Sequence, residues 1–153
     1  MNNIGIIQPN MLAVLRAYLV SCTTVVAAVD QRVFTHSIPK TYAGTDCIVI
    51  ESLPGLGSDP DMPITDLSFS FKCFSKDKST ALEIERTGLF PNLHGYDIFI
   101  DGEELSFPLD FPIDFSRAWM SAVQSQSSIL VQDTDYVGEY WYSESEYNIT
   151  LRY

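Results

Sequence analysis

Residues 64–89 read ITDLSFSFKCFSKDKSTALEIERTGL, and this stretch decides the fold. Its first half alternates in polarity: Leu67, Phe69, Phe71 and Cys73 are apolar, whereas Ser68, Ser70 and Lys72 are polar. Such alternation predicts a strand with one buried face. The second half predicts a helix that begins near Ser75 or Thr80, because Thr80 and Glu83 have the spacing of a capping box. Gly88 stands where a left-handed residue would end that helix.

The segments before this unit predict a helix and two strands. Residues 10–29 are expected to form one helix, because apolar side chains recur every three or four positions: Leu12, Leu15, Leu19, Cys22, Val26 and Val29. Residues 32–53 contain two expected strands, at 32–37 and 46–53, and the second is apolar enough to be central and covered on both faces. Residues 54–63 hold three prolines and two glycines, which predicts a loop.

The segments after the unit predict an insertion and two closing strands. Residues 96–107 are expected to form a hairpin around the Asp101-Gly102 turn. Asp114 is expected to cap a short helix to about residue 124 that buries Phe115, Trp119 and Val123, and 125–128 is read as a polar linker. The insertion thus spans 91–125, and strands close the chain within 129–153.

The whole order predicts a single α+β domain over residues 1–153. Its sheet is expected to be antiparallel or mixed, with about five or more strands, two main helices packed on it and one inserted hairpin. At 153 residues the chain is long enough to bury a substantial core.

The charge is strongly negative and unevenly distributed. The formal net charge is −11; residues 1–87 hold nine acids and seven bases, whereas 88–153 hold eleven acids and only Arg117 and Arg152. This balance argues against a phosphate-binding nucleic-acid interface and against an anionic membrane surface. The uneven distribution is typical of ordinary solvated surface, or of head-to-tail complementarity between copies in a ring.

The cysteines and the N-terminal region indicate a reducing compartment. Cys22, Cys47 and Cys73 lie in apolar runs, form no CxxC pair and are odd in number. The uncharged run 17–29 is too short to span a bilayer, and no cationic segment precedes Arg16. We therefore expect synthesis in a cytoplasm without a signal peptide.

No catalytic pattern is visible, so we expect no enzyme and no cofactor. His36 and His94 have no nucleophile or acid at a spacing that belongs to a known mechanism. Gly55-Leu-Gly57 lacks the rest of a nucleotide-binding fingerprint. Asp59, Asp61 and Asp66 are weak metal candidates, because their spacing is not that of an EF-hand.

Aromatic residues crowd the end of the chain: Tyr136, Tyr140, Trp141, Tyr142, Tyr147 and Tyr153. Three readings stay open for them. They can be strand residues that half-cover a sheet, interface residues, or an aromatic platform for a sugar.

The order of these segments resembles the tail-terminator (tail-completion) proteins of long-tailed bacteriophages, lambda type. The matching parts are the strand 47–53, the loop to residue 63, the strand 67–74 with Ser75-Lys76-Asp77, and the helix to residue 89. The ending from Asp135-Tyr136 through WYSESEYNITLRY (141–153) is similar to that family's closing strands. Residues 91–125 match nothing in the family.

The resemblance implies a virion protein at the junction of tail and neck. It implies a homohexameric ring that caps the tail tube, joins it to the head connector and lets DNA pass without specific binding. An acidic bore would repel phosphates. The expected bore residues are Asp97, Asp101, Glu103, Glu104, Asp110 and Asp114. The expected contacts with neighbouring copies or proteins are Leu53, Leu56, Met62, Lys72, Lys76, Lys78, Arg86, Tyr140, Trp141 and Tyr142.

Two alternatives stay open beside the terminator. One is another structural protein of the neck or tail tube with the same architecture. The other is an acidic, aromatic-rich binding module, with carbohydrate as its ligand.

Overall fold

The computed structural model describes residues 11–58, 64–95, 97–101 and 117–152. Its elements, in chain order, are α1 (Met11–Ser21), α2 (Thr23–Val29), β1 (Val33–Thr35), the 3-10 turn η1 (Lys40–Tyr42), β2 (Cys47–Ser58), β3 (Ile64–Ser75), α3 (Lys78–Glu83), the π-helical segment η2 (Ile84–Leu89), α4 (Phe90–Leu93), β4 (Asp97–Asp101), β5 (Arg117–Gln132) and β6 (Trp141–Arg152).

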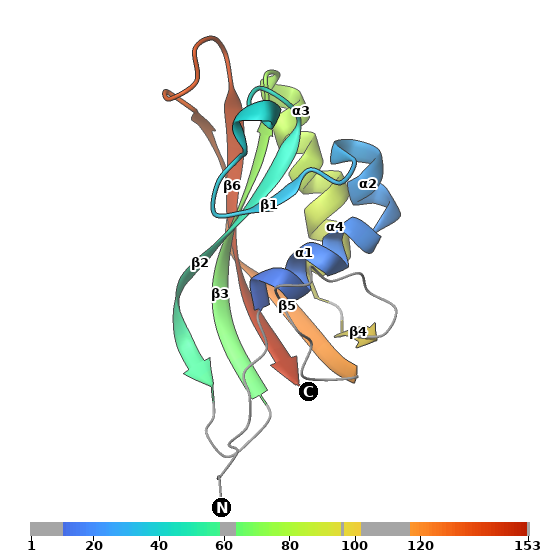
Figure 1. Cartoon of the computed structure of the whole chain (residues 1–153). Helices are drawn as coiled ribbons and strands as arrows, with labels where there is room; N and C mark the ends of the chain where they lie inside the picture. The colour runs from blue at the N-terminus through green and yellow to red at the C-terminus, as the bar shows by residue number, and fades with distance from the viewer. Residues whose placement is uncertain (1–10, 59–63, 96, 102–116, 153) are drawn as a thin grey trace, which may run out of the picture.

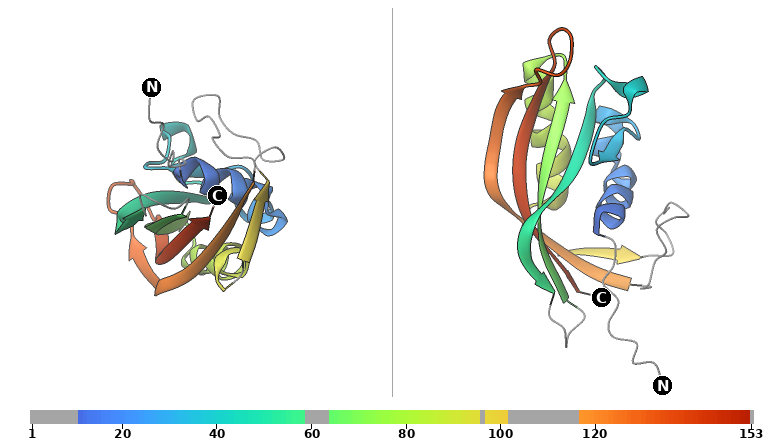
Figure 2. Two further views of the ribbon diagram at one scale, coloured as in Figure 1. Left: turned by 90° about the horizontal axis from the view of Figure 1, so that it is seen from below. Right: turned by 60° about the vertical axis from the view of Figure 1, so that its left-hand side comes forward.

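The strands form one mixed sheet in the order β1-β2-β3-β6-β5-β4. Only β1 and β2 are parallel, and every other pair is antiparallel. The sheet curls into a half-barrel, and the helices lie together against one of its faces (Figures 1 and 2). The predicted α+β fold with a mixed sheet is therefore confirmed.

Alternation along β3 separates the two faces of this sheet. Phe69, Phe71 and Cys73 are buried in the main core, which the helices cover. The intervening side chains of Ser68, Ser70 and Lys72 belong to the opposite face, which we call the open face. β6, the neighbour of β3, follows the same rule: Tyr147, Ile149 and Leu151 complete the main core.

The predicted helix 10–29 is wrong as a single element. The chain breaks at Cys22, whose backbone is extended (φ −82°, ψ 122°), and the axes of α1 and α2 differ by 88°. Ser21 and Cys22 both donate side-chain hydrogen bonds to the Tyr18 carbonyl, which competes with the helix ladder. The β-branched run from Thr23 then lowers helix propensity just past the break. No single described helix has the length and apolarity needed to cross a membrane; α1 and α2 meet that test only as this bent pair.

The predicted loop 54–63 is wrong over its first five residues, because β2 continues to Ser58. The register of β2 against β3 shifts between Leu53 and Gly57, so the extra residues form a bulge. The parallel partner β1 ends opposite Ile50, which leaves the outer side of β2 unpaired within the described sheet at Pro54. Proline is tolerated on such an edge because no ladder hydrogen bond is needed there. Residues 59–63 lie outside the described part.

The predicted caps of the helix after β3 are also wrong. Asp77 is the N-cap, and the Thr80 hydroxyl donates to its carboxylate at 2.9 Å instead of forming a box with Glu83. The helix does not end at Gly88. It continues through η2 and α4 to Leu93, and Gly95, with φ +79°, follows. Gly88 is buried, and a β-carbon there would lie 3.9 Å from a Val25 methyl group, an ordinary van der Waals contact, so packing against α2 does not require a glycine at this position.

The predicted helix 114–124 and linker 125–128 are wrong from residue 117 onward, where β5 runs unbroken to Gln132. Trp119 and Val123, expected to be buried, are 48% and 55% exposed. A spacing of four residues is even, so it places two side chains on one face of a strand as well as of a helix. The decisive pattern is the alternate burial of Met120 and Ala122.

The predicted hairpin 96–107 pairs differently from expectation. Its first strand exists as β4, but the partner of β4 is the 117–121 segment of β5. Residues 102–116 lie outside the described part, and Asp114 and Phe115 are among them. The predicted closing strands are confirmed as the end of β5 and as β6.

Candidate functional site

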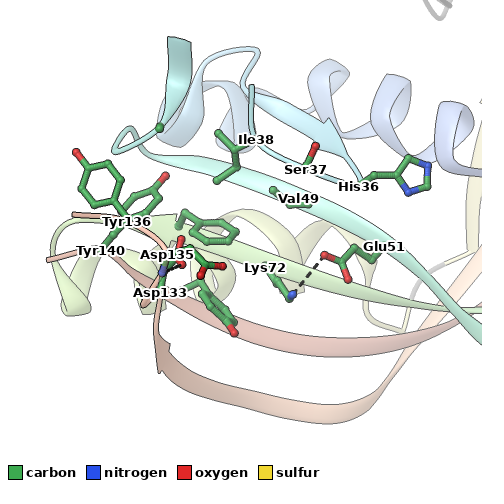
Figure 3. Close-up of a pocket in the computed structure, with 13 residues that line it drawn as sticks. His36, Ser37, Ile38, Val49, Glu51, Lys72, Asp133, Asp135, Tyr136 and Tyr140 are labelled. Carbon is green, nitrogen blue, oxygen red and sulfur yellow. Dashed lines mark hydrogen bonds and ion pairs between the residues drawn. The ribbon is translucent and has the colours of Figure 1, made fainter. Parts of the chain in front are cut away.

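A cleft of about 370 Å³ lies on the open face, toward one end of the sheet. Figure 3 shows His36, Ser37 and Ile38 along one side, Asp133 and Asp135 on the other, and Lys72 and Glu51 between them. The strands contribute side chains that alternate with core residues: Val49 and Glu51 from β2, Lys72 and Phe74 from β3, and Tyr142 from β6. The strands therefore supply five of the thirteen lining residues, and the segments flanking η1 and the loop between β5 and β6 supply the other eight.

Four aromatic rings form a continuous chain at this site. Phe74 contacts Tyr140 and Tyr142 with ring centroids 5.2 and 4.9 Å apart, and Tyr136 lies 4.9 Å from Tyr140. These rings belong to a second, smaller core that also includes Cys47 and Val49. Offset and tilted aromatic pairs add stability beyond simple burial. The open face is thus anchored at this end by an apolar cluster of its own.

Tyr140 is the fixed centre of this cluster. It is 1% exposed, and its hydroxyl donates to the Thr45 carbonyl and lies 3.5 Å from the Cys47 sulfur. Burial raises the pKa of Cys47 to about 11, although the Tyr140 hydroxyl acts to lower it. Burial also raises the pKa of Tyr140 well above its ordinary value. Both groups stay neutral near pH 7, so neither is set up as a nucleophile or base.

A charged pair occupies the middle of the cleft. Lys72 Nζ lies 3.3 Å from Glu51 Oε1 and 5.2 Å from the centroid of the Tyr142 ring. Burial acts to lower the pKa of Lys72, but attraction by Glu51, Glu144 and Tyr142 outweighs it and raises that pKa. A cation over a tyrosine ring and beside a carboxylate is stabilised by both.

The rim consists of two loops with tight local bonding. The Asp135 amide donates to the Asp133 carboxylate at 3.0 Å, and the Asp133 amide donates to the Tyr140 carbonyl at 2.8 Å. On the other side, His36 has φ 76°, an uncommon conformation for a residue with a side chain. Its amide donates to the Ile50 carbonyl at 3.1 Å, which fixes the loop to β2.

The structure brings only some of the predicted contact residues to this cleft. Lys72, Tyr140 and Tyr142 line it, although Tyr140 is buried within the subunit. Lys76 lies 5.9 Å from the Tyr136 ring centroid, close to the cleft. Lys78 instead lies 4.2 Å over Trp141. Arg86 pairs with Glu83 on the helix layer, so the four bases do not form one surface.

Several other predicted residues can be placed only in part. Leu53 is half-buried in β2. Asp97 pairs with Arg152 at 3.7 Å, and Asp66 accepts a hydrogen bond from Thr150. The remaining ones have side chains outside the described part: Leu56, Asp59, Asp61, Met62, Asp101, Glu103, Glu104, Asp110 and Asp114. Within the described residues, no group of three or more His, Cys, Asp or Glu could hold a metal.

Sequence reasoning missed the acidic residues Glu51, Asp133 and Asp135 as members of one site. The strand alternation that places Val49 on the open face also places Glu51 there, so this signal was present. The approach of the loop after β5 to β2 depends on β6 lying next to β3, which no local pattern encodes.

A buried carboxylate on the helix side was also missed. Glu85 in η2 is 6% exposed and accepts hydrogen bonds from the Tyr147 hydroxyl at 2.8 Å and from the Gln124 amide at 3.1 Å. His94 contacts the same glutamine as Glu85 does: the His94 Nδ1 accepts a hydrogen bond from the Gln124 backbone amide, whereas Glu85 is bonded to the Gln124 side chain. These bonds tie the helix layer to β5 and β6. In the described part of the chain, neither histidine is hydrogen-bonded to a serine, cysteine or carboxylate.

Comparisons with known proteins identify a similar fold among solved structures. No protein-family model and no curated protein sequence matches the chain. Among solved structures, a chain of the "Virion of native gene transfer agent (GTA) particle" has the same fold, with a TM-score of 0.57 and 13% sequence identity. The match covers 94% of this chain and 94% of that chain.

Proposed function

We propose that this chain is a structural subunit of a virion: a tail terminator that forms a ring, caps the tail tube and joins it to the head connector. The observation that carries the proposal is the fold shared with a gene transfer agent virion chain, because it extends over 94% of both chains. The order of strands and helices in residues 47–89, which resembles tail terminators, supports the finer assignment.

The shape of the subunit supports assembly into a ring. One layer is made of helices and the other presents an open sheet face, so the two sides offer different chemistry (Figure 2). Contact between unlike surfaces of identical subunits produces a closed ring when the rotation closes.

Electron microscopy and native mass spectrometry test the ring directly. We expect six-fold rings at high protein concentration, over a range of salt and divalent cation. Purified tail-tube protein then tests the role: a terminator should stop growth of the tube at a defined length. Protein that stays monomeric under all these conditions, with and without tube protein, contradicts the proposal.

The tube-growth experiment also distinguishes a tail terminator from a structural protein of the tail tube. A structural protein of the tail tube should stack its rings into long tubes, whereas a terminator should leave single rings or capped ends. Continued elongation after addition of this protein therefore favours the tube component over the terminator.

We further propose that acids of residues 97–114 line the bore through which DNA passes. Replacing Asp97, Asp101, Glu103 and Glu104 by lysine should slow DNA packaging or ejection, because phosphates would then be held. Unchanged rates would remove this segment from the bore. Lysine at Glu139, an exposed acid in another loop, is the matched control.

The cleft gives a specific reason to keep a second candidate, a carbohydrate-binding module. Tyr136 and Tyr142 are half-buried and line the cleft beside three carboxylates. A glycan array tests this function: specific binding that is lost on Tyr142→Ala supports it, and an array without binding eliminates it.

A further inference from the structure

The carboxylates of the cleft are not all matched by cations. Lys72 pairs with Glu51, but no described ion pair involves Asp133 or Asp135. Both acids line the cleft beside the aromatic chain. Counting Lys72 against Glu51, the lining keeps two negative charges that a cationic ligand could offset.

Aromatic rings at this end of the molecule already pair with cations of the same subunit. Three lysines lie over aromatic rings: Lys72 over Tyr142, Lys76 over Tyr136 and Lys78 over Trp141. A guanidinium group is planar, stacks on aromatic rings and pairs with carboxylates in a fork. The cleft volume of about 370 Å³ lies at the lower end of the range for ligand pockets, as expected for a single inserted side chain.

Four arginines have described side chains, and three of them are poorly placed to supply such a group from a second copy. Arg16 and Arg32 donate to the backbone carbonyls of Val33 and Asp46 inside their own subunit. Arg152 is on the open face itself, paired with Asp97. Arg86 lies on the helix layer, and its side chain is 71% exposed.

We propose that the cleft binds the Arg86 side chain of a neighbouring copy, with its guanidinium paired with the carboxylates of Asp133 and Asp135. Glu83, the present partner of Arg86, lies three residues away on the same exposed surface. An exposed pair of this kind contributes little and exchanges readily. Because the cleft and Arg86 lie on opposite layers, the contact is head-to-tail. This inference rests on the proposed ring and names one of its contacts.

A charge swap tests the contact. Arg86→Glu should raise the protein concentration needed for half-maximal ring assembly by about 30-fold or more, the usual effect of removing one partner of a buried charge pair. The double variant D133K/D135K should weaken assembly similarly. Combining R86E with D133K/D135K should restore most of it, because the signs of charge on the two sides of the contact are then exchanged.

The matched control is Arg152→Glu, which changes the net charge by the same amount at another exposed arginine paired with an aspartate. Rings of R152E should assemble like the wild type. Thermal unfolding of each variant checks that the subunit stays folded, since all four positions lie outside the main core.

The outcomes separate the inference from the proposed function. If wild-type rings form and R86E rings form equally well, the Arg86 contact is wrong and the ring stands. If the wild type forms no ring under any condition, the proposed ring and the proposed Arg86 contact are both wrong. A direct probe completes the test: N-acetyl-arginine amide should shift the NMR signals of Tyr136 and Tyr142 at concentrations where N-acetyl-citrulline amide does not. Equal effects of the two probes overturn the cleft's preference for a cation.

Discussion

The two faces of the sheet are built from the same strands but differ in what holds them. On the helix-covered face, Phe69, Phe71 and Tyr147 are buried in one large core. On the open face, the buried apolar residues of the described part form the small cluster around Tyr140, and charged side chains such as Lys72 and Glu51 share the surface. Stability therefore depends mainly on the first face, which leaves the second free to vary its contacts with other molecules.

The largest expected effect comes from the helix-covered face. Phe71 is fully buried, and its ring packs edge-on against Tyr147 with centroids 5.3 Å apart. Phe71→Ala should lower the free energy of unfolding by about 3–5 kcal/mol, because it removes buried apolar surface and leaves a cavity. Denaturant titration measures this change.

The matched control for that prediction is Phe99→Ala on the open face, where the Phe99 side chain is 48% exposed. Its loss should cost about 1 kcal/mol or less. Equal losses of unfolding free energy for the two variants would show that the open face contributes as much to stability as the helix-covered face does.

The buried hydroxyl of Tyr147 gives the next effect. Burial, followed by the Glu85 carboxylate, raises the pKa of Tyr147 well above its ordinary value of about 10. A phenol whose folded pKa is raised contributes stability that is fully present below the unfolded pKa and is lost as pH rises above it. Stability should thus fall above about pH 10.

Tyr147→Phe tests this effect on two scales. At pH 7 it should cost about 1–2 kcal/mol, because Glu85 loses one of its two donors. Above pH 10 the variant should lose less stability with rising pH than the wild type does. The variant lacks the Tyr147 phenol, so of the two buried tyrosines with a raised pKa, Tyr147 and Tyr140, only Tyr140 still contributes to the loss. Identical pH profiles for variant and wild type would contradict the assignment.

The sequence predicted the centre of the sheet well because its strands are buried on one face only, so apolar and polar residues alternate along them. β3 and β6 carry large apolar side chains on the covered face and polar ones on the other, and a period of two admits no helix. The closing strand followed from this pattern, whereas the fold class also required the order of helices and strands along the whole chain.

Prediction failed where short-range patterns are ambiguous. Trp119 and Val123 satisfy a helix and a strand equally, and the pairing of β5 with β6 decides between them. Pro54 would end a strand that is paired on both sides, but it is tolerated in β2 because β2 is an edge strand at that point. That edge exists because β1 ends opposite Ile50, which the sequence around Pro54 does not reveal. The cleft escaped prediction for the same reason, since it joins loops that are about a hundred residues apart in the chain.

The tyrosine at the centre of the small cluster ranks next on the open face. Tyr140→Phe keeps the ring in contact with Phe74 but removes the hydroxyl that donates to the Thr45 carbonyl. We expect a loss of about 1 kcal/mol in unfolding free energy, measured by denaturant titration. A loss as large as that of Phe71→Ala would mean that the second cluster holds the fold as strongly as the first.

The smallest effect should come from the ion pair that crosses the cleft. Lys72 and Glu51 side chains are 22% and 36% exposed, so water and salt screen their attraction. A double-mutant cycle with Lys72→Met and Glu51→Gln should give a coupling energy of about 0.2–1 kcal/mol, decreasing with added salt. The methionine keeps the apolar stem of Lys72, which separates loss of charge from loss of packing. A coupling above that range, or one that salt does not weaken, would mean that the open face is held by electrostatics and is less free to exchange partners.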